Sequence, residues 1–235
     1  MTDNIVSLNS FAFDILETVR PNIVDDENID ERLIKYEIIN QRALWLRNNL
    51  MKYNSIDPSI IQDLGCVDVE LVDSALCCSN TGGCQILRTT NQIPDTIDIP
   101  GLNTITRVAP IGAIDYPFSL VSYSRAIFSN NGRFNKKIIF AFQKDRYIYL
   151  KSGKMSASDY LGITKISVQG VFEDPTDVNN FRGCNNNNPC YSDDDPFPLQ
   201  RWLIPYIKTE VIKQLSIKIN APEDKDNDAT SKVEK

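Results

Sequence analysis

Six cysteines are the residues of this chain best suited to metal or redox chemistry, because thiolates bind zinc and thiols form disulfides. They fall into two groups, which are Cys66, Cys77, Cys78 and Cys84, then Cys184 and Cys190. A zinc site built from cysteines requires two closely spaced pairs, whereas adjacent residues on a strand point to opposite faces. Cys77 and Cys78 therefore fit one ion poorly, and we expect at least half of the six to be buried free thiols.

Disulfide bonds are the second chemistry open to these cysteines. Reduced thiols are the default in a cytosolic product, and spacing alone does not assign partners. The short segment between Cys184 and Cys190 allows a small closed loop. If bridges form, we expect Cys184–Cys190 and one pair within Cys77, Cys78 and Cys84.

Histidine is absent from the whole sequence. This absence excludes Ser-His-Asp triads, Cys-His pairs and zinc sites that contain imidazole. No GxxxxGK[ST] phosphate loop occurs, and Gly82-Gly83 does not join a strand to a helix as in a dinucleotide site. We therefore expect neither phosphate binding nor a cofactor.

Acidic residues gather at two places, Glu173-Asp174 and Asp193-Asp194-Asp195. Such carboxylates could bind calcium or perform paired-carboxylate hydrolysis. Three adjacent aspartates, however, lack the alternating positions and the turn glycine of a calcium loop. Acids at a helix N-terminus and in a solvated loop explain both groups better, because the positive end of the helix dipole favours carboxylates. A carboxylate-dependent hydrolase is kept as an alternative hypothesis.

Length and charge limit the classes of protein that fit. The chain has 235 residues, 42% of them hydrophobic, with a net charge of −6 and a pI of about 4.8. This length suits one domain with a sizeable core, and an acidic chain without a basic stripe does not indicate a free nucleic-acid binder. The apolar run Ile138–Phe142 is too short to span a membrane, and no secretory signal is apparent. We expect synthesis in the cytoplasm and no membrane contact.

Apolar periodicity predicts helices near both ends of the chain. An apolar stripe over Leu8–Val19 indicates the first helix. The second runs over about Ile29–Leu50, with Asn28 and Glu31 as a capping box. The last helix begins near Pro198, and Pro205 should produce a kink or a restart in its first turn.

Two Asp-Pro pairs predict shorter helices between these, because aspartate caps a helix and proline fits its first turn. Asp57-Pro58 begins one that reaches about Leu64, and Asp174-Pro175 begins one that reaches about Phe181.

The middle of the chain alternates short apolar runs with turn residues, which predicts about seven or eight strands. The predicted strands are 67–72, 85–89, 96–99, 104–108, 119–128, 136–142, 146–150 and 163–172. The clearest hairpin joins 136–142 to 146–150 through Gln143-Lys144-Asp145.

Together these elements predict an α+β fold, in which helices from both ends of the chain form a bundle beside a central antiparallel β-domain. The predicted parts are N-terminal helices (1–65), a β-domain (66–172), a C-terminal helical segment (173–220) and a disordered acidic tail (221–235). Trp45, Trp202 and Tyr206 are the expected core or interface anchors of the helical part.

Several long stretches together resemble a family of virion structural proteins of crAss-like bacteriophages that infect Bacteroides. They are IDERLIKYEIINQRALWLRN (29–48), IDPSIIQDLGCVDVELVDSALCC (56–78), NGRFN (131–135), GVFEDPTDV (170–178), PCYSDDD (189–195) and RWLIPYIK (201–208). The resemblance covers residues from about 29 to 222, and its motifs are long without being catalytic.

The resemblance implies a ring protein of the head-to-tail connector, similar to podovirus tail adaptors. The implied assembly is a homo-oligomeric, twelve-fold ring that contacts the portal protein and other tail rings. DNA and cargo proteins would pass through its bore during genome ejection. It also implies a place in the tail or neck of the virion and no enzymatic activity.

An alternative from another class is a tail module that binds a receptor or glycan. Such a module needs exposed aromatic rings, and the candidates are Tyr116, Phe118, Tyr123, Tyr147 and Tyr149. The alternation of these residues within strands predicts that most of them face the core.

Overall fold

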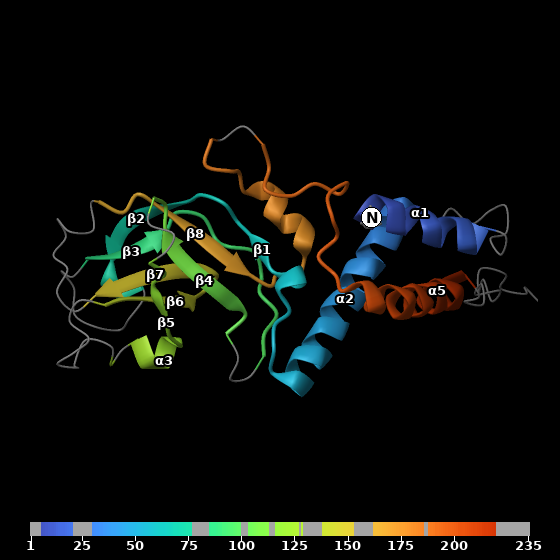
Figure 1. Ribbon diagram of the computed structural model, residues 1–235, viewed down its shortest axis with the longest axis horizontal. Coiled ribbons are helices and arrows are strands. Elements are labelled where there is room, and N and C mark those ends of the chain that lie inside the picture. The colour runs from blue at the N-terminus through green and yellow to red at the C-terminus, as the bar shows by residue number, and fades with distance from the viewer. Residues whose placement is uncertain are drawn as a thin grey trace, which may run out of the picture.

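The computed structural model describes residues 6–20, 30–76, 85–99, 103–112, 116–126, 128, 138–152, 162–185 and 188–219. A curled sheet lies at one end of an elongated molecule, and three long helices pack at the other end (Figure 1). We call these the β unit and the helical unit. The predicted mixed α+β class is confirmed.

Helix α1 spans Leu8–Val19, as predicted. The Ser7 side chain accepts a hydrogen bond from the Ser10 backbone N–H, and the Ser10 side chain accepts one from the Ser7 N–H, which completes a capping box. The buried residues are Leu8, Phe11, Ala12, Ile15 and Val19, so the apolar stripe forms the inward face.

Helix α2 spans Glu31–Tyr53 and ends at Asn54, whose φ of 51° places it in the left-handed region. Its cap is Asp30, whose carboxylate accepts a hydrogen bond from the Arg32 N–H at 3.3 Å, so the prediction of Asn28 as the cap was wrong. The deeply buried positions recur every four residues at Ile34, Ile38, Arg42, Leu46 and Leu50. A charged residue therefore occupies the centre of the buried face.

Helix α5 spans Ile204–Ile219 and follows a 3-10 turn, η5, over Arg201–Leu203. Pro205 lies in the first turn of α5, which confirms the predicted restart. The predicted start near Pro198 was too early. The Lys208 ammonium of α5 contacts the Asp14 carboxylate of α1 at 2.6 Å.

Both Asp-Pro pairs start 3-10 helices, η2 over Pro58–Ile60 and η4 over Pro175–Asn180. In each case the aspartate carboxylate accepts from the N–H two residues later, at 2.8 Å for Asp57 and 2.7 Å for Asp174. The first is shorter than predicted because residues 62–63 pair with a strand instead.

Among the described residues, eight strands form the β unit. They are β1 (Gln62–Asp63), β2 (Val67–Asp73), β3 (Gln85–Thr89), β4 (Ile105–Pro110), β5 (Ser119–Leu120), β6 (Ile139–Lys144), β7 (Tyr147–Ser152) and β8 (Lys165–Gly170). Strand β8 pairs with β4 on one side and with β1 and β2 on the other. From β2 the order of strands in the sheet continues through β3, β7 and β6 to β5. These pairings are antiparallel except β5 with β6.

The sheet curls until its two ends meet. Just before β5, the Phe118 N–H donates to the Val108 carbonyl of β4 at 2.8 Å, so the last strand of the row returns beside the first. Side chains on the inner face form one cluster that includes Leu87, Val108, Ile148 and Val168. The curled sheet therefore surrounds the apolar core of the β unit.

Two strand predictions fail locally. Residues 119–128 give only the short β5, because the Ser122 carbonyl then accepts from the Arg125 and Ala126 N–H groups and begins helix α3 (Tyr123–Ala126). Residues 96–99 form isolated bridges in place of a strand, among them Thr96 to Phe172. The β6–β7 hairpin forms as predicted, although Asp145 and Arg146, both with positive φ, make a tighter turn than expected.

Arg42 joins the two units. Its side chain is fully buried, with Nε donating to the Pro198 carbonyl at 2.9 Å and Nη1 donating to the carbonyls of Phe172 at 2.9 Å and Glu173 at 3.3 Å. Burial lowers the pKa of this guanidinium to about 10, which leaves it charged at neutral pH. One side chain of α2 therefore binds the segment after β8 and the segment before α5 together.

Within the part of the chain that the structure describes, none of the helices has the length and apolar character needed to cross a membrane.

We predict that Arg42→Met lowers the free energy of unfolding by about 3 kcal/mol, because buried carbonyls lose charged donors while the methionine keeps most of the volume. Urea denaturation followed by circular dichroism measures the change. Arg47→Met is the matched control, since Arg47 is exposed on the same helix, and its expected change is within about 0.5 kcal/mol. Equal stabilities for the two variants would show that Arg42 does not hold the units together.

Candidate functional site

The cysteines are paired differently from the prediction. The structure joins Cys66 to Cys184 across a sequence separation of 118 residues, and Cys190 is a free, half-buried thiol. The expected Cys184–Cys190 bond was therefore wrong. Cys77, Cys78 and Cys84 lie outside the described residues.

Backbone pairing explains why Cys184 does not reach Cys190. Arg182 and Pro189 form an antiparallel bridge, and the Cys190 N–H donates to the Phe181 carbonyl at 2.9 Å. Cys190 thus lies opposite Phe181, while Cys184 lies farther out along the same hairpin. Cys184 and Cys190 are therefore kept apart by the pairing register of the hairpin, although few residues lie between them in the sequence.

Gly65 permits the close approach that brings Cys66 to Cys184. Its φ is 65°, and a Cβ added there would lie 2.8 Å from the Cys190 Sγ and 3.1 Å from the Arg182 carbonyl oxygen. A side chain at this position would be strained at that φ and would force the Cys190 Sγ and the Arg182 carbonyl to shift. Among the described residues, no group of three or more cysteine and acidic side chains is placed to hold a metal ion.

The acidic residues have structural partners. Asp174 caps η4, the Asp193 carboxylate accepts from the Lys35 ammonium at 3.2 Å, and the Asp195 carboxylate accepts from the Ser192 N–H at 2.8 Å. The Glu173 N–H donates to the Asp95 carbonyl at 2.8 Å. These contacts explain the acidic stretches as caps and turns, so no geometry here favours the hydrolase hypothesis.

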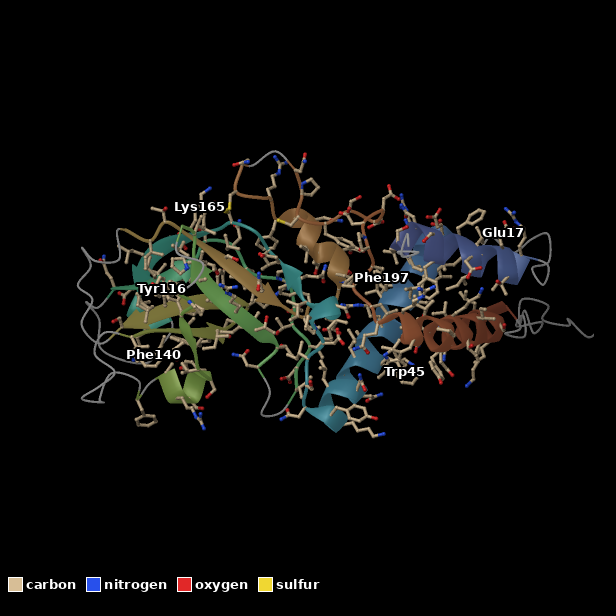
Figure 2. The ribbon with its side chains drawn as sticks, in the orientation of Figure 1. Glu17, Trp45, Tyr116, Phe140, Lys165 and Phe197 are labelled. Atoms are coloured by element: carbon tan, nitrogen blue, oxygen red, sulfur yellow. A yellow bond between two sulfur atoms is a disulfide. The ribbon has the colours of Figure 1, made fainter. Side chains whose placement is uncertain are left out.

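Three aromatic residues form a partly exposed cluster on the helical unit. The Tyr206 ring lies 5.6 Å from Trp45 and 6.3 Å from Trp202, measured between ring centroids. Trp202 and Tyr206 are each 54% exposed, while Trp45 is half-buried (Figure 2 labels Trp45). We call Trp45, Trp202 and Tyr206 the aromatic surface. Tryptophan and tyrosine side chains that pack against one another and stay exposed to solvent supply much of the binding energy in protein interfaces.

The aromatic residues of the β unit are mostly internal, as predicted. Phe118 and Tyr149 are buried, and Tyr123 and Tyr147 are half-buried against the Phe142 cluster. Tyr116 alone of these candidates is largely exposed, at 78%. A glycan platform needs several exposed rings side by side, so the receptor-binding alternative gains no support from these residues.

Arg42 and the Cys66–Cys184 bond are the features that sequence reasoning missed. A signal for Arg42 existed, because it stands at the four-residue spacing of Ile34, Ile38 and Leu46 and is the charged residue on that stripe. No comparable signal marks Cys66 and Cys184, because their approach depends on strand order and on Gly65.

Comparison with known proteins gives two consistent results. The sequence profile of the family described as phage tail ring protein 2 matches residues 10–233. The chain is also similar to Ring protein 2 of Bacteroides phage crAss001, with 24% identity over 229 residues, which are 95% of this chain and 96% of the relative. Both matches include the helical unit and the β unit, and they confirm the predicted resemblance to crAss-like phage ring proteins.

We predict that Cys66→Ser lowers the free energy of unfolding by about 4 kcal/mol, because the bond restricts a long loop of the unfolded chain. Cys190→Ser, which leaves the bond intact, should cost about 1 kcal/mol or less. Urea denaturation compares the variants. Peptide mapping of the unfolded wild-type chain, alkylated without reductant, should find Cys66 linked to Cys184 and Cys190 alkylated; alkylated Cys66 would contradict the bond.

Proposed function

Because the chain belongs to the phage tail ring protein 2 family, we propose that it assembles into a homo-oligomeric ring in the connector between the head and tail of the virion. Family membership makes it a structural protein of the phage tail. The ring, its twelve-fold symmetry and its position below the portal protein, against other tail rings, are parts of this proposal. In this proposal the assembled subunits form the wall of the channel through which DNA and cargo proteins pass.

The aromatic surface is the observation that carries the proposal. A closed ring requires a heterologous contact, in which one patch of each subunit meets a different patch of the next. Trp45, Trp202 and Tyr206 offer a rigid apolar patch with two rings more than half exposed. Burying those rings against a neighbour would remove apolar area from water and stabilise the contact.

The arrangement of the chain supports a division of labour between the two units. Helices from both ends of the chain, within 1–65 and 173–220, would act as a bundle that forms the subunit contacts. The β-domain, 66–172, would be carried by that bundle. The predicted tail, 221–235, lies outside the described residues. Arg42 would keep the two units in one orientation, which a symmetric ring needs in each copy.

The charge of the chain suits a passage for DNA and cargo proteins. The net charge of −6 gives a ring whose wall repels phosphates on average. DNA held by phosphate contacts would move slowly, because each contact to a cationic side chain adds affinity. An acidic wall would therefore let the genome slide during ejection.

We predict that the double variant Trp202→Ala, Tyr206→Ala reduces the fraction of subunits in rings by about tenfold or more at fixed concentration, because truncating interface rings costs about 2 kcal/mol each. Native mass spectrometry and electron microscopy of the purified protein, alone and with portal protein, measure the ring fraction. Circular dichroism checks that the variant is folded.

Tyr36→Ala is the matched control for ring assembly. Tyr36 is a 60% exposed aromatic residue on α2 outside the aromatic surface, so its truncation should leave the ring fraction unchanged. Wild-type chain that stays monomeric under all these conditions would overturn the proposed function. Rings that survive the double variant would remove the aromatic surface from the contact.

A further inference from the structure

The outer side of helix α1 carries a large exposed ring. Phe13 is 62% exposed, and Glu17, about one turn later, is exposed as well. The buried residues Leu8, Phe11 and Ile15 occupy the opposite side of the helix. We call Phe13 and Glu17 the α1 face. Its ring can still gain free energy by burial, so the face can stabilise a contact with another apolar surface.

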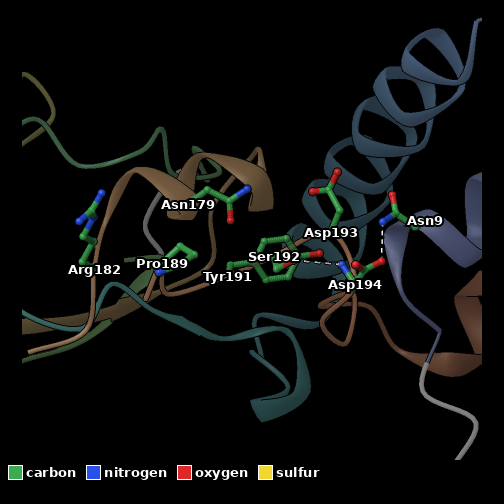
Figure 3. A pocket seen from close by; sticks show the side chains of 8 residues that line it. All are labelled: Asn9, Asn179, Arg182, Pro189, Tyr191, Ser192, Asp193 and Asp194. Carbon is green, nitrogen blue, oxygen red and sulfur yellow. Dashed lines mark hydrogen bonds between the residues drawn. The ribbon is translucent and has the colours of Figure 1, made fainter. Parts of the chain in front are cut away.

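Helix α1 is fixed to the rest of the helical unit along its length. The Asn9 Nδ2 donates to the Asp194 Oδ1 at 2.5 Å, a bond that Figure 3 shows, and the Asn9 N–H donates to the Asp193 carbonyl at 3.2 Å. Farther along the helix, the Asp14 carboxylate meets the Lys208 ammonium of α5 at 2.6 Å. The α1 face is therefore presented in a fixed orientation, which lowers the entropy lost when it binds.

The α1 face and the aromatic surface lie on opposite sides of the helical unit. Lys208 marks the side of α5 that meets α1, and Tyr206 stands two residues earlier, a rotation of about 200° around the helix. In the view of Figure 2, Glu17 lies toward the upper side of the helical unit and Trp45 toward the lower side. Two different patches on opposite sides of one subunit are what a closed ring requires.

The helices that carry the two patches have opposite charge. Helix α1 contains the acids Asp14 and Glu17 and no lysine or arginine. The segment 201–219, which carries Trp202 and Tyr206, contains four basic residues against one acid, Glu210. Within the subunit this complementarity already shows in the bond between Asp14 and Lys208, so the outward charges of the same two helices are also matched in sign.

The outward charges have only weak local partners. Glu17 pairs with Arg20 at 2.7 Å, and Lys213 of α5 pairs with Glu210 at 3.7 Å. Both are pairs three residues apart on an exposed helix surface, which contribute little to stability. Glu17 and Lys213 can therefore exchange these partners for a pair across a subunit contact at little cost.

We propose that the α1 face of one subunit binds the aromatic surface of the next subunit. Phe13 would pack on the rings of Trp202 and Tyr206, and Glu17 would pair with Lys213. The inference rests on the proposed ring and names the second patch of its contact. Repetition of this contact in one rotational sense would close the ring.

A second exposed apolar pair fits the aromatic surface less well. Leu44 and Met51 on α2 are 52% and 54% exposed. The exposed charged residues next to them in the sequence are Arg47 and Lys52, which have the same sign as Lys213. Like charges facing one another oppose association, so α1 is the better partner.

Cross-linking of mixed-isotope rings tests the contact directly. Rings assembled from unlabelled and nitrogen-15-labelled chains are treated with a water-soluble carbodiimide, which joins a carboxylate to a lysine. Peptides that link Glu17 to Lys213 should combine one labelled and one unlabelled chain, whereas links between Asp14 and Lys208 should stay within one chain and serve as the internal control. Glu17 links found only within single chains, or no Glu17 link beside the control link, would overturn the inference.

A charge exchange tests the same pair by assembly. Glu17→Lys and Lys213→Glu should each lower the ring fraction about fivefold, because like charges would then face each other across the contact. The double variant should recover most of the wild-type ring fraction in native mass spectrometry. Neither local pair is restored in the double variant, so recovery requires a contact between positions 17 and 213. A double variant that assembles no better than the worse single variant would count against the contact.

Truncation tests the apolar part of the contact. Phe13→Ala should lower the ring fraction about fivefold or more, because it removes the ring that would cover Trp202 and Tyr206. Leu44→Ala is the matched control and should leave the ring fraction unchanged. Phe13 is largely exposed, so circular dichroism should show an intact fold. Rings lost in Leu44→Ala but kept in Phe13→Ala would assign the contact to α2 instead.

The two proposals fail in different ways. Wild-type chain that forms no rings would remove the proposed function. Wild-type rings that persist in Phe13→Ala and in both single charge variants would keep that function and refute only the α1 contact.

Discussion

The buried guanidinium of Arg42 makes three hydrogen bonds to backbone carbonyls from two distant parts of the chain. Removing a charge from water costs free energy, which the bonds made by Nε and Nη1 offset, while Nη2 is buried without a hydrogen-bond partner among the described residues. The three bonds therefore favour one arrangement in which α2, the segment after β8 and the segment before α5 meet together. The orientation of the β unit relative to the helical unit follows from that arrangement.

Apolar packing reinforces the same junction from both sides. The core cluster of the helical unit includes Ile97, Ile99 and Val171, which come from the β unit and lie next to the residues that Arg42 binds. A subunit with a continuous core across its two units resists bending between them, since packed interiors transmit strain rather than absorb it. The aromatic surface is thereby held in one orientation relative to the β unit.

Local features of the fold were predictable from the sequence, and long-range features were not. The stripe over Leu8–Val19, the two Asp-Pro caps and the β6–β7 hairpin depend on neighbours in the chain, and each was found at about its predicted place. Helix α3 replaced a predicted strand because a few backbone bonds beginning at Ser122 outweigh weak strand propensity. The partner of Cys66 and the order of the strands arise from contacts between residues far apart in sequence, which periodicity does not encode.

The bond between Cys66 and Cys184 has a mechanical consequence. Strands β2 to β8 all lie between these two residues in the sequence, so the bond makes them a covalently closed ring of chain. Tension applied to the two ends of the polypeptide would cross from one sulfur to the other and bypass the strands. The load would fall on the helices, on β1 and on the short connections outside that closed ring, while strands β2 to β8 would carry none of it.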